Sequence, residues 1–273
     1  MRVRNLIALL SLPLWMLGIV DRVSAADTTT GGATGDTVWA GVQTGTPPST
    51  GGADSRGCRW TLASVDNGDW STGFVKTVDG VVYDLFRRDC TDTITVHWIP
   101  RVTSSTLARN ASVMVAARLP DPVLQMAPPA DLGVVGVPTW LWIGADRWQS
   151  VSATAWVPTA GGTVWARTTA TPRRITFTTQ DDGSRTGSET VVIECEGRGD
   201  EWSVETGDEI ASSCSHTYRH SSAQRPSGVF VAVVSIEWET TFRSSTGGSG
   251  TLEPLRTSAI MTVSVDELQA LVG

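Results

Sequence analysis

The chain has 273 residues, of which 40% are hydrophobic and 18% charged, and its 21 basic and 28 acidic side chains give a formal net charge of −7. A surface with this negative balance repels the phosphates of nucleic acid and the headgroups of anionic lipid. We therefore expect no nucleic-acid partner.

The first 25 residues have the pattern of a secretory signal peptide. Arg2 and Arg4 precede an apolar run over Leu6–Val20, and Ser-Ala ends the segment before Ala26. The run of 15 residues is shorter than the roughly 20 that a membrane-spanning helix needs. Cleavage is therefore favoured over the alternative, a retained anchor. We expect a mature chain with no transmembrane span, secreted or retained at the cell envelope, with 18 basic and 27 acidic side chains and a charge of −9.

Residues 26–57 are rich in Thr, Gly, Ser and Pro and have few apolar side chains to bury. Segments of this composition remain flexible in solution. We expect a flexible leader here.

Residues 58–126 have the pattern of a small N-terminal unit. Two strands, Phe74–Val78 and Val81–Phe86, flank Asp79-Gly80, which is a strong signal for a two-residue hairpin turn. A third strand is predicted over Thr93–Ile99. A unit of this size has a marginal core, so we expect it to depend on a disulfide and on docking against its neighbour.

A helix is predicted to follow this third strand. Ser104 or Ser105 can cap its first turn, and the helical pattern runs to about Ala117. Three apolar residues fall on one face of it: Leu107, Ala111 and Met114. The proline-rich segment 120–129 that comes next predicts a stiff, extended connector between two modules.

Residues 127–273 predict an antiparallel β-sandwich, because short strands recur with turn signals between them. The predicted strands are Thr139–Ile143, Val151–Val157, Thr163–Ala170, Ile175–Thr179, Val191–Cys195, Val229–Phe242 and Ala259–Val265. In the longest of them, apolar residues share one parity from Phe230 to Phe242, while polar residues hold the other. That alternation is typical of a half-buried strand.

The four cysteines allow three pairings, and in an exported chain disulfides are expected rather than a metal site. Proximity in sequence favours Cys58 with Cys90 and Cys195 with Cys214. A zinc site would need closer pairs such as Cys-x-x-Cys, and the sequence has none.

Three motifs in the second half resemble those of the PKD (polycystic kidney disease repeat) domain, an immunoglobulin-like sandwich. They are Phe177-Thr-Thr-Gln-Asp-Asp-Gly183, His216-Thr-Tyr218 and the valine-rich start of the strand over Val229–Val234. The first motif departs from the family pattern, with Phe177 in place of tryptophan and Gln180 in place of the first glycine. Because of this departure, we expect the tight turn of the family to be remodelled around Asp181, Asp182 and Gly183.

A wider resemblance, to a family of uncharacterised exported actinobacterial proteins, covers most of the chain. It rests on Pro138-Thr-Trp-Leu-Trp142, Cys195-Glu-Gly-Arg-Gly, Cys214-Ser-His-Thr-Tyr and the C-terminal Val263-Ser-Val-Asp-Glu. This resemblance implies an envelope protein and assigns no reaction to it.

The candidate chemical groups favour structural roles. Tyr218 is expected to hydrogen-bond through its hydroxyl to nearby backbone, as in the tyrosine corner of related sandwiches, and His216 to fix the same corner. The alternative is a hydrolase in which His216 or His220 activates a nearby serine, Ser215, Ser221 or Ser222, but the chain lacks a Gly-x-Ser-x-Gly elbow. Acidic pairs such as Asp181 and Asp182 match no dedicated calcium loop. We expect no catalytic residue, cofactor or metal ligand.

Twelve tryptophans are unusual beside two tyrosines, and they carry the strongest binding alternative. Trp140 and Trp142 share one face of a predicted strand, with Trp148 close by, so they are a candidate platform for stacking on sugar rings. A sandwich core also needs such side chains. The main hypothesis is a non-enzymatic exported protein whose PKD-like domain mediates protein–protein interaction or scaffolding. The alternative is a carbohydrate or cell-wall binding module with exposed tryptophans.

Overall fold

The computed structural model of the chain describes residues 32–34, 37–39, 41–43, 57–63, 74–181, 183, 190–205 and 212–268. The expected signal peptide, most of the expected leader and Asp182 lie outside these residues. The described part is mainly β, with one α-helix and two disulfides. No helix in it is both long and apolar enough to cross a membrane.

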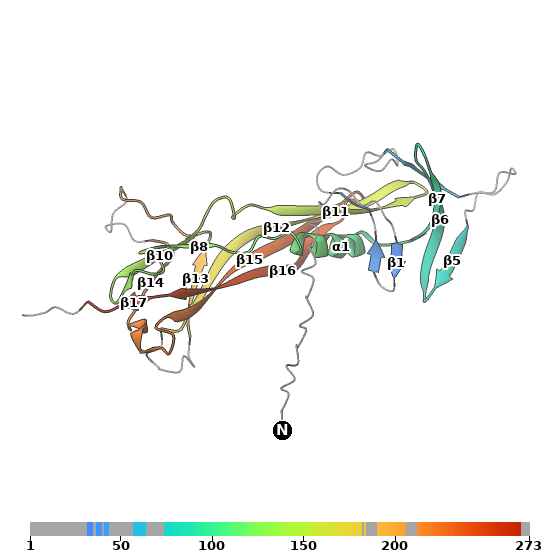
Figure 1. Ribbon diagram of the computed structural model, residues 1–273. Helices are drawn as coiled ribbons and strands as arrows, with labels where there is room; N and C mark the ends of the chain where they lie inside the picture. Colours follow the sequence, from blue (N-terminus) through green and yellow to red (C-terminus); the bar gives the residue numbers. More distant parts are fainter. Residues whose placement is uncertain are drawn as a thin grey trace, which may run out of the picture.

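The largest sheet is built around one long strand, β12 (Gly162–Thr179) (Figure 1). Along one edge β12 pairs with β15 (Phe230–Ser244), which pairs in turn with β16 (Ser249–Val263). Along its other edge, β11 (Val151–Thr159) pairs with the first half and β13 (Val191–Glu196) with the second half. A short strand, β3 (Gly41–Gln43), continues the sheet beyond β11. All of these pairings are antiparallel.

Strand β12 unites two segments that the sequence predicts as separate strands, 163–170 and 175–179. The pairing register with β15 shifts between Pro172 and Arg174, which marks a β-bulge. A bulge lets a strand continue past a proline, which has no N–H to donate to the ladder. The prediction of two strands was therefore wrong, because Pro172 bends the strand without ending it.

The alternation predicted from Phe230 to Phe242 is confirmed in β15. Phe230, Val234 and Trp238 are each at most 1% exposed. They belong to a buried cluster that also contains Phe177 of β12 and Leu141 of the next sheet. Strand β16 is longer than the predicted 259–265. It begins at Ser249, ends at Val263 and accommodates Pro254 because it lies at the edge of the sheet.

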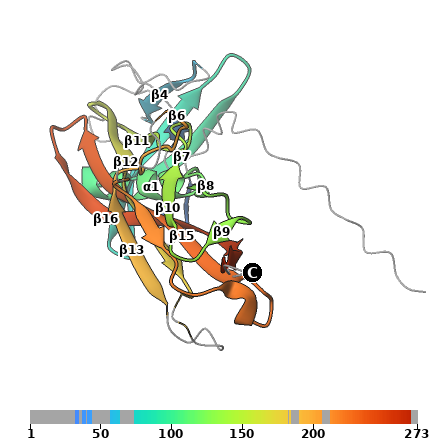
Figure 2. The same ribbon diagram turned by 90° about the vertical axis from the view of Figure 1, so that its left-hand side faces the viewer.

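A three-stranded sheet lies over one end of the large sheet and contributes to the same buried cluster. Its central strand β10 (Pro138–Ile143) pairs with β8 (Leu124–Ala127) and β14 (Ser215–Thr217). Strand β8 falls within the segment predicted as a connector, so part of that segment is a strand. Beside this sheet, β9 (Gly133–Val134) and β17 (Val265–Asp266) form a short parallel pair, and Ser222–Gln224 form a 3-10 helix (Figure 2).

The helix α1 (Ser104–Ala116) covers the other end of the large sheet. Its buried residues are Leu107, Ala108, Ala111 and Val115, whereas Met114 is only partly buried. The cap is Thr103 rather than the predicted Ser104 or Ser105, since the Thr103 hydroxyl accepts from the N–H of Thr106 at 3.2 Å. The two alanines let the helix approach β12 closely, where the Thr168 hydroxyl donates to the carbonyl of Ala108 at 2.8 Å.

A four-stranded sheet lies beyond the helix. Its central strand β6 (Val81–Asp89) pairs on one side with β4 (Arg59–Leu62) and β5 (Val75–Val78), and on the other with β7 (Ile94–Pro100). The predicted hairpin turn is present, with φ of 49° at Asp79 and 79° at Gly80. A two-stranded hairpin, β1 (Gly32–Thr34) with β2 (Thr37–Trp39), completes the described strands.

One buried cluster joins the four-stranded sheet to the rest of the molecule. Trp60 and Phe86 lie in it with Leu107 of α1 and Trp156 of β11. The rings of Trp60 and Trp156 meet edge to face, with centroids 6.2 Å apart. Packing therefore crosses the boundary that the sequence predicts near residue 126.

Candidate functional site

The side chain of Asp181, 1% exposed, is the centre of a polar cluster just beyond the end of β12. It accepts four hydrogen bonds. Oδ2 accepts from His216 Nε2 at 3.1 Å and from the Arg219 N–H at 3.0 Å. Oδ1 accepts from His220 Nδ1 at 3.0 Å and from the His220 N–H at 3.1 Å. One carboxylate thus ties the turn after β12 to the segment that follows β14.

These hydrogen bonds fix which ring nitrogens carry protons, because an ionised carboxylate only accepts. His216 Nε2 and His220 Nδ1 are the protonated nitrogens. Burial lowers the pKa of His216 below its usual value, while the charge of Asp181 opposes that shift in part. The neutral form of His216 is therefore favoured at pH 7. The other ring nitrogen of His220, Nε2, faces Gly183. A Cβ added at Gly183 would lie 2.8 Å from this Nε2.

Tyr218 connects the cluster to the hydrophobic core. Its ring is fully buried, stacks on Phe230 with centroids 5.7 Å apart, and meets His216 edge to face at 4.5 Å. Burial raises the pKa of its phenol. The hydroxyl is buried and makes no hydrogen bond with any described residue. The backbone hydrogen bond expected of a tyrosine corner is therefore not formed within the described part of the chain, and Tyr218 contributes through the packing of its ring.

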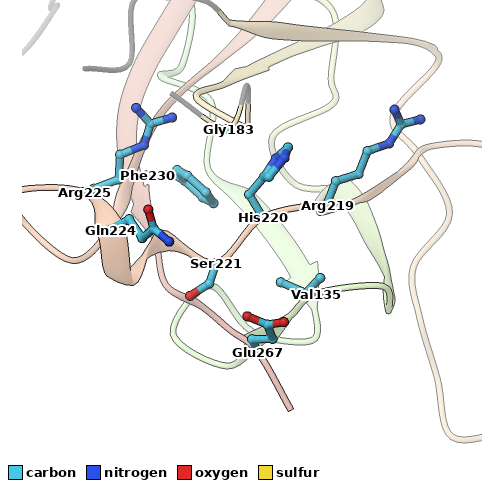
Figure 3. A pocket seen from close by; sticks show the side chains of 9 residues that line it. All are labelled: Val135, Gly183, Arg219, His220, Ser221, Gln224, Arg225, Phe230 and Glu267. Carbon is cyan, nitrogen blue, oxygen red and sulfur yellow. The ribbon is translucent and has the colours of Figure 1, made fainter. Parts of the chain in front are cut away.

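A pocket of about 250 Å³ adjoins His220 (Figure 3). Arg225 lies on one side of it, donates to the carbonyl of Gln180 and holds its guanidinium 5.2 Å from the centroid of the Phe230 ring. The Ser221 hydroxyl donates to the carbonyl of Val265 at 3.0 Å. The Ser222 hydroxyl donates to the carbonyl of Gly228 at 2.8 Å and accepts from the Val265 N–H at 2.9 Å.

Asp181 and His220 are arranged like the acid and base of a nucleophile relay. A relay also needs a nucleophile beside the imidazole. The two neighbouring serines donate to backbone carbonyls instead, Ser221 to Val265 and Ser222 to Gly228, so neither is placed as that nucleophile. The described residues also contain no group of three or more His, Cys, Asp or Glu placed to hold a metal ion. The arrangement holds two chain segments together.

Four of the five motif residues predicted from the sequence meet here: Asp181, Gly183, His216 and Tyr218. Sequence reasoning missed His220 as the second ring partner of Asp181. The spacing His216-x-x-x-His220 was visible in the sequence, but the contact with Asp181 spans 39 residues.

The predicted tryptophan platform is buried. Trp140 and Trp142 are 6% and 8% exposed, and Trp148, half-buried, follows β10 in a turn. Because Leu141 and Ile143 point into the core, the indoles of Trp140 and Trp142 lie on the opposite face of β10. The segment after β13 lies at the edge of β10. The Ile143 N–H donates to the Arg198 carbonyl at 2.8 Å. An exposed stripe at these residues is therefore a prediction that the structure corrects.

The four-stranded sheet presents a second candidate site, which we call the outer face. Since Trp60, Phe86 and Ile99 point toward the helix, the alternate side chains point the other way. Seven of these side chains are apolar or aromatic, and Lys76 lies among them: Phe74, Lys76, Val78, Tyr83, Leu85, Ile94, Val96 and Trp98. Ile94 is 62% exposed and Val96 61%.

The charges on the outer face are mostly positive. Arg59, Lys76 and Arg87 share it with Asp89, and Arg87 Nε contacts Asp89 Oδ1 at 2.9 Å. Lys76, the only lysine of the chain, holds its ammonium 4.6 Å from the centroid of the Trp98 ring. A basic and aromatic face thus lies on a chain of net negative charge.

Both predicted disulfides, Cys58–Cys90 and Cys195–Cys214, are present. They indicate an oxidising environment outside the cytoplasm. Comparisons of the chain with protein-family models, with curated proteins and with solved structures found no match.

Proposed function

We propose that the chain is a non-enzymatic exported protein that binds a protein partner at the cell envelope or outside the cell. Residues 127–273 serve as a PKD-like scaffold, and the outer face is the binding surface. The outer face is the observation that carries this proposal.

Three properties of the outer face support a protein partner. Its apolar side chains extend across three neighbouring strands, β5, β6 and β7, and contiguous exposed apolar patches usually mark interaction sites. Tyr83, Trp98 and Arg87 belong to the residue types that are enriched in interfaces. The excess of positive charge favours a partner with an acidic surface, because complementary charge raises the rate of association. Binding of cell-wall glycan through Trp140 and Trp142 is not proposed, because both are buried.

The test compares two valine substitutions in the mature chain. Val96→Asp places a negative charge among the apolar side chains of the outer face, on strand β7 opposite Arg87, whereas Val113→Asp changes a valine of α1 that is 69% exposed and lies outside this face. We expect Val96→Asp to weaken binding to isolated envelope fractions by about 10-fold or more, because the new carboxylate interrupts the apolar contact and repels an acidic partner. We expect Val113→Asp to bind like the wild type, and both variants to unfold at the wild-type temperature.

Three outcomes would reject the proposal. Equal binding by both variants would mean that the outer face is not the binding surface. Binding to protein-free peptidoglycan that depends on Val96 would replace the protein partner with a glycan. Turnover of a defined substrate together with no binding to envelope fractions would make the chain an enzyme.

A further inference from the structure

The edge strand β16 has one unpaired side. It pairs with β15 along its whole length, and no strand in the described part of the chain pairs with its other side. A strand at the edge of a sheet offers a row of backbone N–H and C=O groups to any other strand. Proteins usually protect long edges with charge, proline or bulges.

The first half of β16 is protected in these ways and the second half is not. Glu253, Pro254 and Arg256 lie in the first half, and the register with β15 shifts there, between Trp238 and Thr240. From Thr257 to Val263 the pairing with β15 is regular, and the segment Thr-Ser-Ala-Ile-Met-Thr-Val has no charge, proline or glycine. Ile260, at its centre, is 77% exposed.

We propose that Thr257–Val263 pairs antiparallel with the same segment of a second copy of this chain, with the two-fold axis at Ile260. In this register Ile260 lies opposite Ile260 of the second copy, and Ala259 lies opposite the second copy's Met261. The two large sheets then become one sheet that continues through the dimer.

The side chains on both faces of the segment fit this register. On the open face an apolar row runs across the sheet from Val192 through Thr178 and Val233 to Ile260, in hydrogen-bonding order. Pairing of two copies continues the row without interruption and covers Ile260. On the other face, the partly buried Ala259 and Met261 adjoin the core cluster and meet their counterparts.

Charge does not oppose the contact, although both copies are acidic. The charge nearest the axis along the strand is Arg256, four residues from Ile260. The two copies of Arg256 would be about 26 Å apart at 3.3 Å per residue, well beyond the screening length of about 8 Å at physiological salt. Arg256 also lies opposite Glu237 of its own β15. A second copy is therefore favoured over a charged peptide as the occupant of this edge.

This inference goes beyond the proposed function and does not depend on it. Its consequence would be that each particle carries two outer faces. Two linked sites raise the strength of attachment to a surface that carries many copies of a partner.

Sedimentation equilibrium of the full mature chain tests the dimer. We expect the wild type to sediment with twice the chain mass at about 100 µM. Ile260→Lys puts two ammonium groups opposite each other at the axis and should raise the dissociation constant by about 10-fold or more. Val192→Lys is the matched control, because Val192 is 55% exposed on the same face but lies on β13 at the opposite edge. This control should remain dimeric.

Cysteine cross-linking tests the register. Only the residue on the axis is paired with itself, so Ile260→Cys should form a disulfide-linked dimer under mild oxidation, at the Cα separation of directly paired strands. Ser258→Cys alone should not, since its counterpart is the second copy's Thr262. A monomeric wild type, or a dimer that neither Ile260→Lys weakens nor Ile260→Cys links, would overturn the proposal.

Discussion

Replacement of Asp181 by alanine removes the acceptor for four donors at once. The His216 side chain is only 11% exposed, so water cannot readily replace the acceptor that its Nε2–H loses. The N–H groups of Arg219 and His220 lose theirs as well, while the half-exposed His220 ring can turn to solvent. With two or three buried donors unsatisfied at about 1–3 kcal/mol each, partly relieved by relaxation, we expect a loss of about 3 kcal/mol.

The assay is urea unfolding followed by the fluorescence of the twelve tryptophans. Asp146→Ala is the control, because the Asp146 side chain is 79% exposed and its ion pair with Arg147 spans 3.5 Å at the surface. We expect this control to change stability by less than about 0.5 kcal/mol. If Asp181→Ala cost no more than Asp146→Ala, the cluster would not hold the two segments together, and the structural role given to Asp181 would be refuted.

Three further predictions concern the same body. Because burial lowers the pKa of His216 in the folded chain, the unfolded chain binds the proton first as pH falls. The free energy of unfolding should therefore be highest above about pH 6.5 and decline below it. In urea titrations from pH 7.5 to pH 5.5, the free energy of unfolding of His216→Gln should decline less than that of the wild type, because His97 is present in both proteins and contributes equally. Equal declines with pH in the two proteins would contradict this. The double variant Cys195→Ala, Cys214→Ala, which keeps the Cys58–Cys90 disulfide, should lose about 3 kcal/mol of stability without reductant, and an unchanged urea midpoint would contradict this. Gly199→Ala should lower stability by about 2–4 kcal/mol, since φ is +75° there and a Cβ would overlap the Leu141 carbonyl oxygen. The control Gly247→Ala, where φ is +81° and the space is open, should lower stability by only about 1 kcal/mol. Equal losses in the two variants would mean that the close contact is not the cause.

The sequence patterns correctly predicted features that depend on neighbouring residues alone. The alternation in β15 depends on a period of two along one strand, and the turn at Asp79 and Gly80 on the φ angles that those two residues tolerate. The helix was found within one residue of its end, but four successive hydroxyl residues follow Arg101-Val102, and pattern alone could not select Thr103 as the cap.

Contacts between distant segments could not be predicted in this way. Trp140 and Trp142 are buried on a strand whose edge contacts a segment more than 50 residues later in the chain, through the hydrogen bond from Ile143 to Arg198. The continuity of β12 past Pro172 depends on its partner β15. The partnership of His220 with Asp181, and the exposure of Ile94 and Val96, follow from how separate strands are placed in space.

The strands β12 and β15 have a mechanical consequence. Strand β12 has 18 residues, which at 3.3 Å each span about 60 Å, and it extends from beneath the helix to the turn that carries Asp181 (Figure 1). A force applied between the two ends of this strand would shear β12 against its antiparallel neighbour β15. Many inter-strand backbone hydrogen bonds would then bear the force together instead of breaking one after another. The pair therefore acts as a stiff rod that keeps the outer face at a fixed distance from the histidine pocket.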